Sequence, residues 1–167
     1  WIDGDDETRM FVDYWFAEEQ QEALRRIAFV LADLGHNKRT RDAELDILKI
    51  ALSRIIVTKD QGASLARDTS HSRPHRVALK SDYDVWSGFE RSVFRVQDVL
   101  EQCPPKGGVE ILAGDARSLD LTNSSVDFVL TSPPYLNAID YMRGHRMSLV
   151  WLGHSLGSLR TIRSTSI

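Results

Sequence analysis

Val126-Asp127-Phe128-Val129-Leu130-Thr131-Ser132-Pro133-Pro134-Tyr135 is the stretch on which the expected fold of this chain depends. Its first half contains the apolar run Phe128–Leu130, which predicts a short strand buried on both faces. Its second half ends that strand, because Pro133 and Pro134 have no N–H to donate and each holds φ at about −65°. Pro133 also biases Ser132 toward extended geometry. The stretch therefore predicts a stiff turn at the carboxyl end of a strand, which is where ligands bind in open α/β sheets.

This turn presents groups that suit chemistry on the exocyclic amino group of a nucleobase. Such an amine is a poor nucleophile, because its lone pair is delocalised into the ring. The Ser132 hydroxyl and the Pro133 carbonyl can accept its two hydrogens, which draws the nitrogen toward tetrahedral geometry and frees the lone pair. Tyr135 can stack on the base once the base has left the duplex. Pro134 adds rigidity, because acceptors must already point where the transition state needs them.

Thr131-Ser132-Pro133-Pro134-Tyr135 resembles the catalytic motif of the amino-methyltransferases, which use S-adenosylmethionine to methylate exocyclic nitrogens of DNA bases. The first position of that motif is Ser, Asp or Asn, and Ser is the usual form in cytosine-N4 enzymes. The resemblance continues through Leu112–Arg117, which is similar to the family's "GDA" segment, and through Asn137–Tyr141. It implies methyl transfer to DNA, with cytosine N4 favoured over adenine N6. A Pro-Pro-Tyr turn without these neighbours would be a weak signal, and an ordinary proline turn is the alternative.

The resemblance also implies S-adenosylmethionine as cofactor and two residues on its side of the site. Asp115 follows the apolar run Val109–Ala113, a second predicted strand, and matches an acidic residue that lies near the cofactor's adenine in the family. Thr131 opens the motif and is assigned to the cofactor on the same basis. A simple turn or cap role for Asp115 is the alternative. The sequence contains no Gly-x-Gly, so we expect the glycine-rich turn for the cofactor to lie outside it.

The expected fold class is α/β, a partial Rossmann-like methyltransferase sheet preceded by a mostly α-helical segment. Residues 1–105 are assigned to the helical segment, which includes a basic loop at 58–80, and residues 106–167 to the catalytic half of the methyltransferase domain. Apolar residues at three- and four-residue spacing predict helices over 17–34, 41–57, 81–102 and 137–152. The first 15 residues are rich in aromatic side chains and show no clear period. Because the glycine-rich turn is expected elsewhere, we expect a piece of a longer enzyme that is inactive alone.

Basic residues predict contacts with nucleic-acid phosphates, although the formal net charge of the 167 residues is −3. The loop at 58–80 contains Arg73, Arg76 and Lys80 and shows little apolar content. Loops of this length without structure are usually functional or disordered, so a DNA-contacting arm and a solvated linker are both open interpretations. Arg143 and Arg146 follow the motif closely and are predicted to approach phosphate, with ordinary surface charge as the alternative.

Composition argues against several other classes of protein. No apolar run approaches the ~20 residues of a membrane span, and the acidic start of the chain is unlike the basic start of a secretory leader. Cys103 is the single cysteine, which fits a reducing cytoplasm. His71 and His75 have no carboxylate or cysteine to complete a metal set. We therefore expect a cytoplasmic enzyme that binds DNA, without a metal or a membrane.

Two other functions stay open from the sequence. The nearer one is methylation of guanine N2 in RNA or of a glutamine amide in protein, although those enzymes usually carry Asn where this chain has Ser132. The farther one is a non-catalytic helical binding module that retains the proline turn. The recognition sequence and the oligomeric state cannot be read from the residues.

Overall fold

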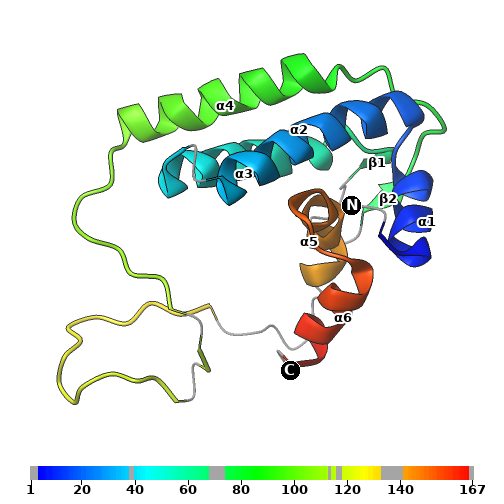
Figure 1. Ribbon diagram of the computed structural model, residues 1–167. Helices are drawn as coiled ribbons and strands as arrows, with labels where there is room; N and C mark the ends of the chain where they lie inside the picture. The colour runs from blue at the N-terminus through cyan, green and yellow to red at the C-terminus, as the bar shows by residue number, and fades with distance from the viewer. Residues whose placement is uncertain are drawn as a thin grey trace.

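The computed structural model describes residues 4–37, 40–67, 74–112, 114–115, 118–132 and 141–165. This part of the chain contains six α-helices, one 3₁₀ helix and a two-stranded antiparallel sheet. The elements are α1 (Asp6–Trp15), α2 (Glu18–His36), α3 (Asp42–Ile56), β1 (Ala66–Arg67), β2 (His75–Arg76), α4 (Val85–Gln102), α5 (Tyr141–Leu149), η1 (Val150–Leu152) and α6 (Leu156–Thr165). Figure 1 shows a helical body, from which the chain between α4 and α5 departs as a long excursion.

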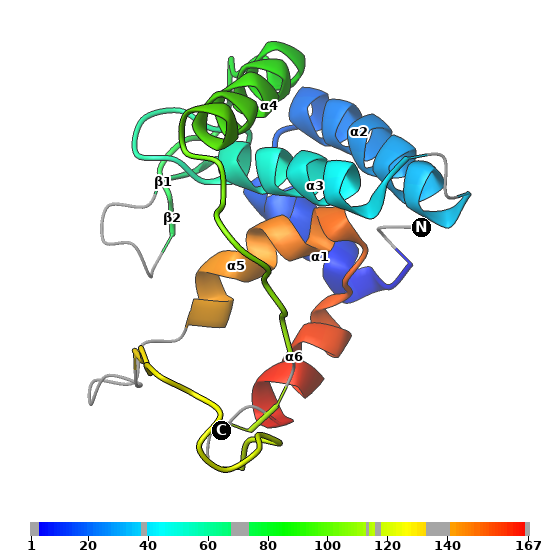
Figure 2. The ribbon, with the colours of Figure 1, turned by 90° about the vertical axis from the view of Figure 1, so that its left-hand side faces the viewer.

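Helices α2 and α3 lie side by side in the body (Figure 2), and they confirm two of the predicted helices. Their ends differ by at most two residues from those predicted by apolar spacing, because their apolar stripes are long and regular. Leu24 of α2 and Leu52 of α3 are fully buried in the shared core. Gly35 lies inside α2 rather than after its end, and a Cβ there would approach Leu45 Cδ2 to 2.9 Å. A larger residue at position 35 would therefore require the end of the Leu45 side chain to shift.

Helix α1 occupies residues for which the sequence pattern predicted no periodic element. Asp5 caps it, since its carboxylate accepts from the Thr8 backbone N–H at 2.8 Å and from the Thr8 hydroxyl at 2.7 Å. The same hydroxyl accepts from the backbone N–H of Leu156, the first residue of α6, at 3.1 Å. A helix of ten residues is marginal alone in water. The cap and the contact with α6 therefore support α1 together with its apolar face, since Phe11 and Val12 are buried in the core.

Replacing Thr8 with valine is expected to lower the free energy of unfolding by about 1–3 kcal/mol, because the buried Leu156 N–H loses its acceptor. The pKa of Asp5 lies below its ordinary value because of the Thr8 backbone and side-chain hydrogen bonds. A lowered folded-state pKa stabilises above the unfolded-state pKa, and this contribution is lost as the pH falls through the lowered value. The valine variant should therefore lose less stability than the parent below about pH 4. Urea unfolding at pH 7 and pH 3 measures both effects.

Thr8→Ser is the matched control, since serine keeps the hydroxyl and loses only a methyl group. Its stability and acid dependence should stay closer to those of the parent than to those of the valine variant. Equal losses in the two variants would show that the hydroxyl does not tie α1 to α6.

Residues 62–66 are buried in the body, unlike the structureless loop that was expected over 58–80. The N–H groups of Ala63 and Ser64 donate to the carbonyls of the last two residues of α3, at 2.7 and 3.1 Å. These carbonyls have no partner inside their own helix, so the segment satisfies them. Leu65 donates to the carbonyl of Trp15 at 2.8 Å, and β1 then pairs antiparallel with β2. Residues 62–66 of the expected loop therefore belong to the core.

Helix α4 begins at Val85 and not at the predicted Ser81. The Asp84 carboxylate caps it by accepting from the N–H groups of Trp86 and Ser87. The Ser81 carbonyl instead accepts from the Gln20 side chain at 3.2 Å, so this residue belongs to the connection to α4. The predicted apolar stripe is buried at the start of α4, where Val85 is 3% exposed, and emerges toward its end.

The two predicted strands, 109–113 and 128–130, have no strand pairing where the structure describes them. Ile111 is 92% exposed and Leu130 is 88% exposed. Between α4 and α5, the described residues form one isolated bridge, Asp115 with Ser118. Two strands alone are marginal in water, so apolar sequence does not build a sheet without further partners. The Rossmann-like sheet stays a prediction.

The C-terminal part consists of α5, η1 and α6. It confirms the predicted helix from residue 141 onward, and residues 137–140 lie outside the described part. Trp151 of η1 is 1% exposed and meets the Phe16 ring edge-on, with 5.0 Å between ring centroids. Gly153 then takes a φ of +93°, a left-handed conformation that glycine adopts without strain, and this ends η1. Helix α6, which the sequence analysis did not predict, follows.

Candidate nucleic-acid interface

The methyltransferase-like motif lies in the excursion between α4 and α5. Thr131 and Ser132 are exposed, whereas Pro133, Pro134 and Tyr135 lie outside the described residues. A buried Ser132 would have excluded the predicted contact with a base. Its exposure leaves the hydroxyl accessible, so the motif assignment stays a prediction for all four catalytic residues.

The two residues predicted on the cofactor side are also exposed. Asp115 accepts from the N–H of Ser118 through its backbone carbonyl at 2.9 Å, and Thr131 lies outside any helix or strand. Both belong to the excursion rather than to the packed helical body (Figure 1). Because Asp115 and Thr131 are exposed, their side chains do not by themselves enclose an adenosine group. The described residues therefore do not form a fitted cofactor site at these two positions.

Two of the three basic residues predicted in the loop, Arg76 and Lys80, lie in the described part of the chain. Arg76 of β2 lies with its guanidinium carbon 4.7 Å from the centre of the Tyr14 ring, and its side chain is half-buried. Lys80 is exposed in the connection to α4. Arg73 lies outside the described residues. The structure thus attaches Arg76 to α1 through the Tyr14 ring.

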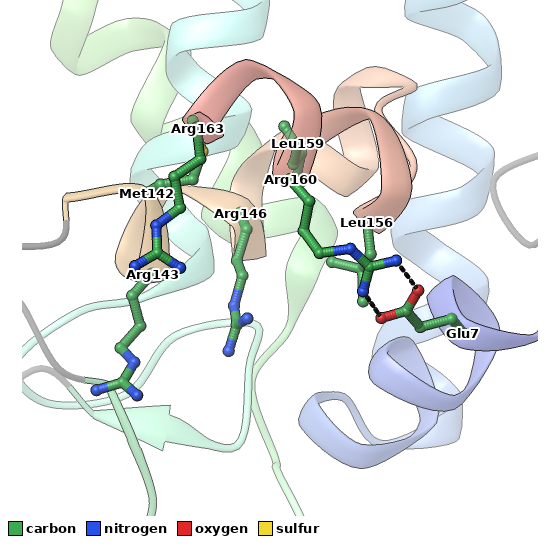
Figure 3. Close-up of a pocket in the computed structure, with 8 residues that line it drawn as sticks. All are labelled: Glu7, Met142, Arg143, Arg146, Leu156, Leu159, Arg160 and Arg163. Atoms are coloured by element: carbon green, nitrogen blue, oxygen red, sulfur yellow. Dashed lines mark hydrogen bonds and ion pairs between the residues drawn. The ribbon is translucent and has the colours of Figure 1, made fainter. Parts of the chain in front are cut away.

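Arg143 and Arg146, the basic residues after the motif, are brought together at a cavity between α5 and α6 (Figure 3). Its volume is about 140 Å³. Two further arginines line it, Arg160 and Arg163 of α6, which the sequence analysis missed. Their three-residue spacing repeats that of Arg143 and Arg146 and places each pair on one helix face, so this spacing was the available signal. The remaining lining residues are Glu7, Met142, Leu156 and Leu159.

Two of these arginines have defined partners on α1. The Arg146 guanidinium carbon lies 5.1 Å from the centre of the Phe11 ring, which is a cation–π distance. Arg160 donates two hydrogen bonds to the Glu7 carboxylate, one of them at 2.7 Å. These hydrogen bonds raise the pKa of Arg160 above its ordinary value, so Arg160 stays charged. Helix α1 therefore helps to hold cations from both α5 and α6 at the rim of this cavity.

Other site types are not represented in the described part of the chain. Within those ranges, no helix has both the length and the apolar content to cross a membrane. The same residues contain no group of three His, Cys, Asp or Glu side chains placed to hold a metal ion. Cys103 is a free, exposed thiol at the end of α4.

Comparison with known proteins relates part of the chain to a DNA methyltransferase. It is 29% identical over 75 residues to the Type II methyltransferase M.BsoBI of Geobacillus stearothermophilus. This match covers 43% of the chain, and the chain spans only 15% of the length of that enzyme. No family model matches the chain, and no solved structure matches it. The similarity supports a relation to methyltransferases in general and does not identify which base is methylated.

Proposed function

We propose that this chain is part of an S-adenosylmethionine-dependent DNA methyltransferase that methylates an exocyclic amino nitrogen, with cytosine N4 favoured over adenine N6. The observation that carries the proposal is the segment 131–135, Thr-Ser-Pro-Pro-Tyr, in a chain similar over 75 residues to a Type II methyltransferase. Serine at position 132 is the basis for preferring cytosine. The exposure of Ser132 supports the proposal, because a base must reach this hydroxyl.

The motif residues have distinct roles in this proposal. The Ser132 hydroxyl and the Pro133 carbonyl accept hydrogen bonds from the target amino group and free its lone pair. Pro134 keeps these acceptors in place, and Tyr135 stacks on the flipped base. S-adenosylmethionine supplies the methyl group when it is bound, with Asp115 and Thr131 on its side of the site. The alkylated amine is acidic, so its proton leaves to water and no dedicated base is needed.

The proposal also gives a role to the two predicted strands, 109–113 and 128–130. Residues 109–113 and 128–130 are strands of a Rossmann-like sheet whose further strands and glycine-rich turn come from sequence outside these 167 residues. Pairing in such a sheet would bury Ile111 and Leu130, which are now 92% and 88% exposed. We therefore expect this chain alone to bind S-adenosylmethionine weakly. Calorimetry that found micromolar cofactor binding by the chain alone would contradict this part of the proposal.

The function itself is tested by treating unmethylated DNA with the complete protein and S-adenosylmethionine, followed by mass spectrometry of the nucleosides. We expect N4-methylcytosine to appear, and its amount to fall to background when the cofactor is omitted. N6-methyladenine instead would refute the base preference and keep the reaction class. Parallel incubations with transfer RNA and with protein test the alternatives, and methylation confined to either of them would overturn the proposal for DNA.

A further inference from the structure

We propose that the cavity lined by Arg143, Arg146, Arg160 and Arg163, here called the arginine cavity, binds a backbone phosphate of duplex DNA. The inference rests on the proposed function and adds two residues of α6 to the nucleic-acid contact. It assigns a site to the cavity in Figure 3, which is lined by arginines of two helices and by Glu7 of α1.

Charge is concentrated at the arginine cavity beyond what the chain as a whole would suggest. Four guanidinium groups and one carboxylate line it, a formal charge of +3, in a chain whose formal net charge is −3. Like charges at three-residue spacing on one helix face repel each other, and both arginine pairs have this spacing. An anion in the cavity would offset that repulsion.

The helix dipoles favour only two of the four arginines at the cavity. Arg146 and Arg163 lie in the last turns of α5 and α6, where a cation is favoured. Arg143 lies in the first turn of α5, where the partial positive charge of the helix end disfavours a cation. Arg160 is in mid-helix and depends on Glu7 from another helix. Of the four arginines, Arg143 is therefore the one that the helix dipoles disfavour, and an anion in the arginine cavity would stabilise its charge.

The shape and lining of the arginine cavity suit a phosphate group. Its volume of about 140 Å³ exceeds several times the ~30 Å³ share of one water molecule, which leaves room for a tetrahedral anion and some of its waters. Leu156 and Leu159, 9% and 3% exposed, form an apolar wall that strengthens the field of the nearby cations. Guanidinium groups match phosphate oxygens with paired N–H donors.

The Glu7 carboxylate would compete with this anion for Arg160. It is 49% exposed and holds Arg160, which is 65% exposed, through two hydrogen bonds. A phosphate at the cavity would have to share Arg160 with the carboxylate and would be repelled by its charge. Removing the charge of Glu7 should therefore strengthen anion binding, whereas removing an arginine should weaken it.

The test measures binding of a fluorescein-labelled DNA duplex to the 1–167 chain by anisotropy over a series of salt concentrations. Arg143→Gln and Arg163→Gln should each weaken binding about tenfold at low salt and lower the slope of log K against log salt by about 1. Glu7→Gln should strengthen binding about threefold or more. Arg26→Gln is the matched control, since Arg26 is 67% exposed on α2 and paired with Glu22. Circular dichroism should report an unchanged fold in all four variants.

Two outcomes would overturn the inference. In the first, the arginine variants and the Arg26→Gln control bind the DNA duplex with the same affinity and the same salt dependence. The other is micromolar binding of inorganic phosphate that depends on the same arginines, since this would make the cavity a site for free phosphate. The measurement involves no methyl transfer, so it is separate from the proposed function. Arginine-dependent DNA binding without any methylated nucleoside would refute the function alone, and methylation by a protein whose cavity variants bind DNA normally would refute only the cavity.

Discussion

Ser132→Ala in the complete protein is expected to lower the rate of DNA methylation about 10²–10³-fold, the usual cost of losing one preorganised polar partner of a reacting group. The alanine variant retains the Pro133 carbonyl but loses the hydroxyl that accepts from the amino group. The effect should appear in kcat more than in KM, since the lost hydrogen bond strengthens as the nitrogen becomes tetrahedral. Nucleoside mass spectrometry under saturating cofactor measures it.

Ser125→Ala is the matched control for this substitution. Ser125 is another exposed serine in the same excursion, six residues before Thr131, the first residue of the motif, and has no assigned role. Its variant should methylate DNA at the parental rate. Because Ser132 is exposed, its loss should not disturb packing, and thermal unfolding of both variants should match that of the parent. A Ser132→Ala protein that keeps half or more of the parental rate would refute the assignment of this hydroxyl.

Trp151→Ala is expected to lower the free energy of unfolding by about 3–5 kcal/mol, the largest stability loss that we expect from one side chain here. Trp151 is 1% exposed and packs edge-on against Phe16 at 5.0 Å. It also borders a small cavity with Ala28 and Leu31 of α2. Because η1 connects α5 to α6, the substitution should loosen both helices from the body. Urea unfolding followed by circular dichroism measures the loss.

Two further variants test the cause of this loss. Trp151→Phe should cost about half as much, since it keeps a ring and removes an indole N–H that has no hydrogen-bond partner among the described residues. Trp86→Ala is the matched surface control, because Trp86 is 51% exposed on α4, and its cost should stay under about 1 kcal/mol. Similar losses at positions 86 and 151 would contradict the packing described for η1.

Long amphipathic helices were predictable from the residues, and short ones were not. The helices predicted over 17–34 and 41–57 are confirmed, because each repeats its apolar spacing over four turns or more. Helices α1 and α6 have ten residues each, which is fewer than three turns and gives a periodicity argument little length. Their shared hydrogen bond, from Leu156 to Thr8, joins residues 148 positions apart. No local pattern can report such a contact.

At the candidate interface, too, local sequence patterns did not report which distant residues come together. Arg143 and Arg146 were singled out because they follow the motif, and the structure places them at one cavity. Arg160 and Arg163 carry the same spacing but lie in a segment with no predicted helix, so nothing in the chain connected them to the first pair. The predicted phosphate contacts of Arg76 and Lys80 stay predictions, and the structure adds that Arg76 packs over Tyr14 of α1.

By itself the sequence determined the chemistry that can be proposed here and the positions of the long helices. Both depend on neighbours within a few residues, namely a hydroxyl before two prolines and apolar side chains every three or four positions. Only the tertiary structure decided that residues 62–66 are buried and that arginines of α5 and α6 meet beside Glu7. The reason is physical: burial and charge clustering depend on which distant segments share a surface, and a helix or strand signal carries no record of its partner.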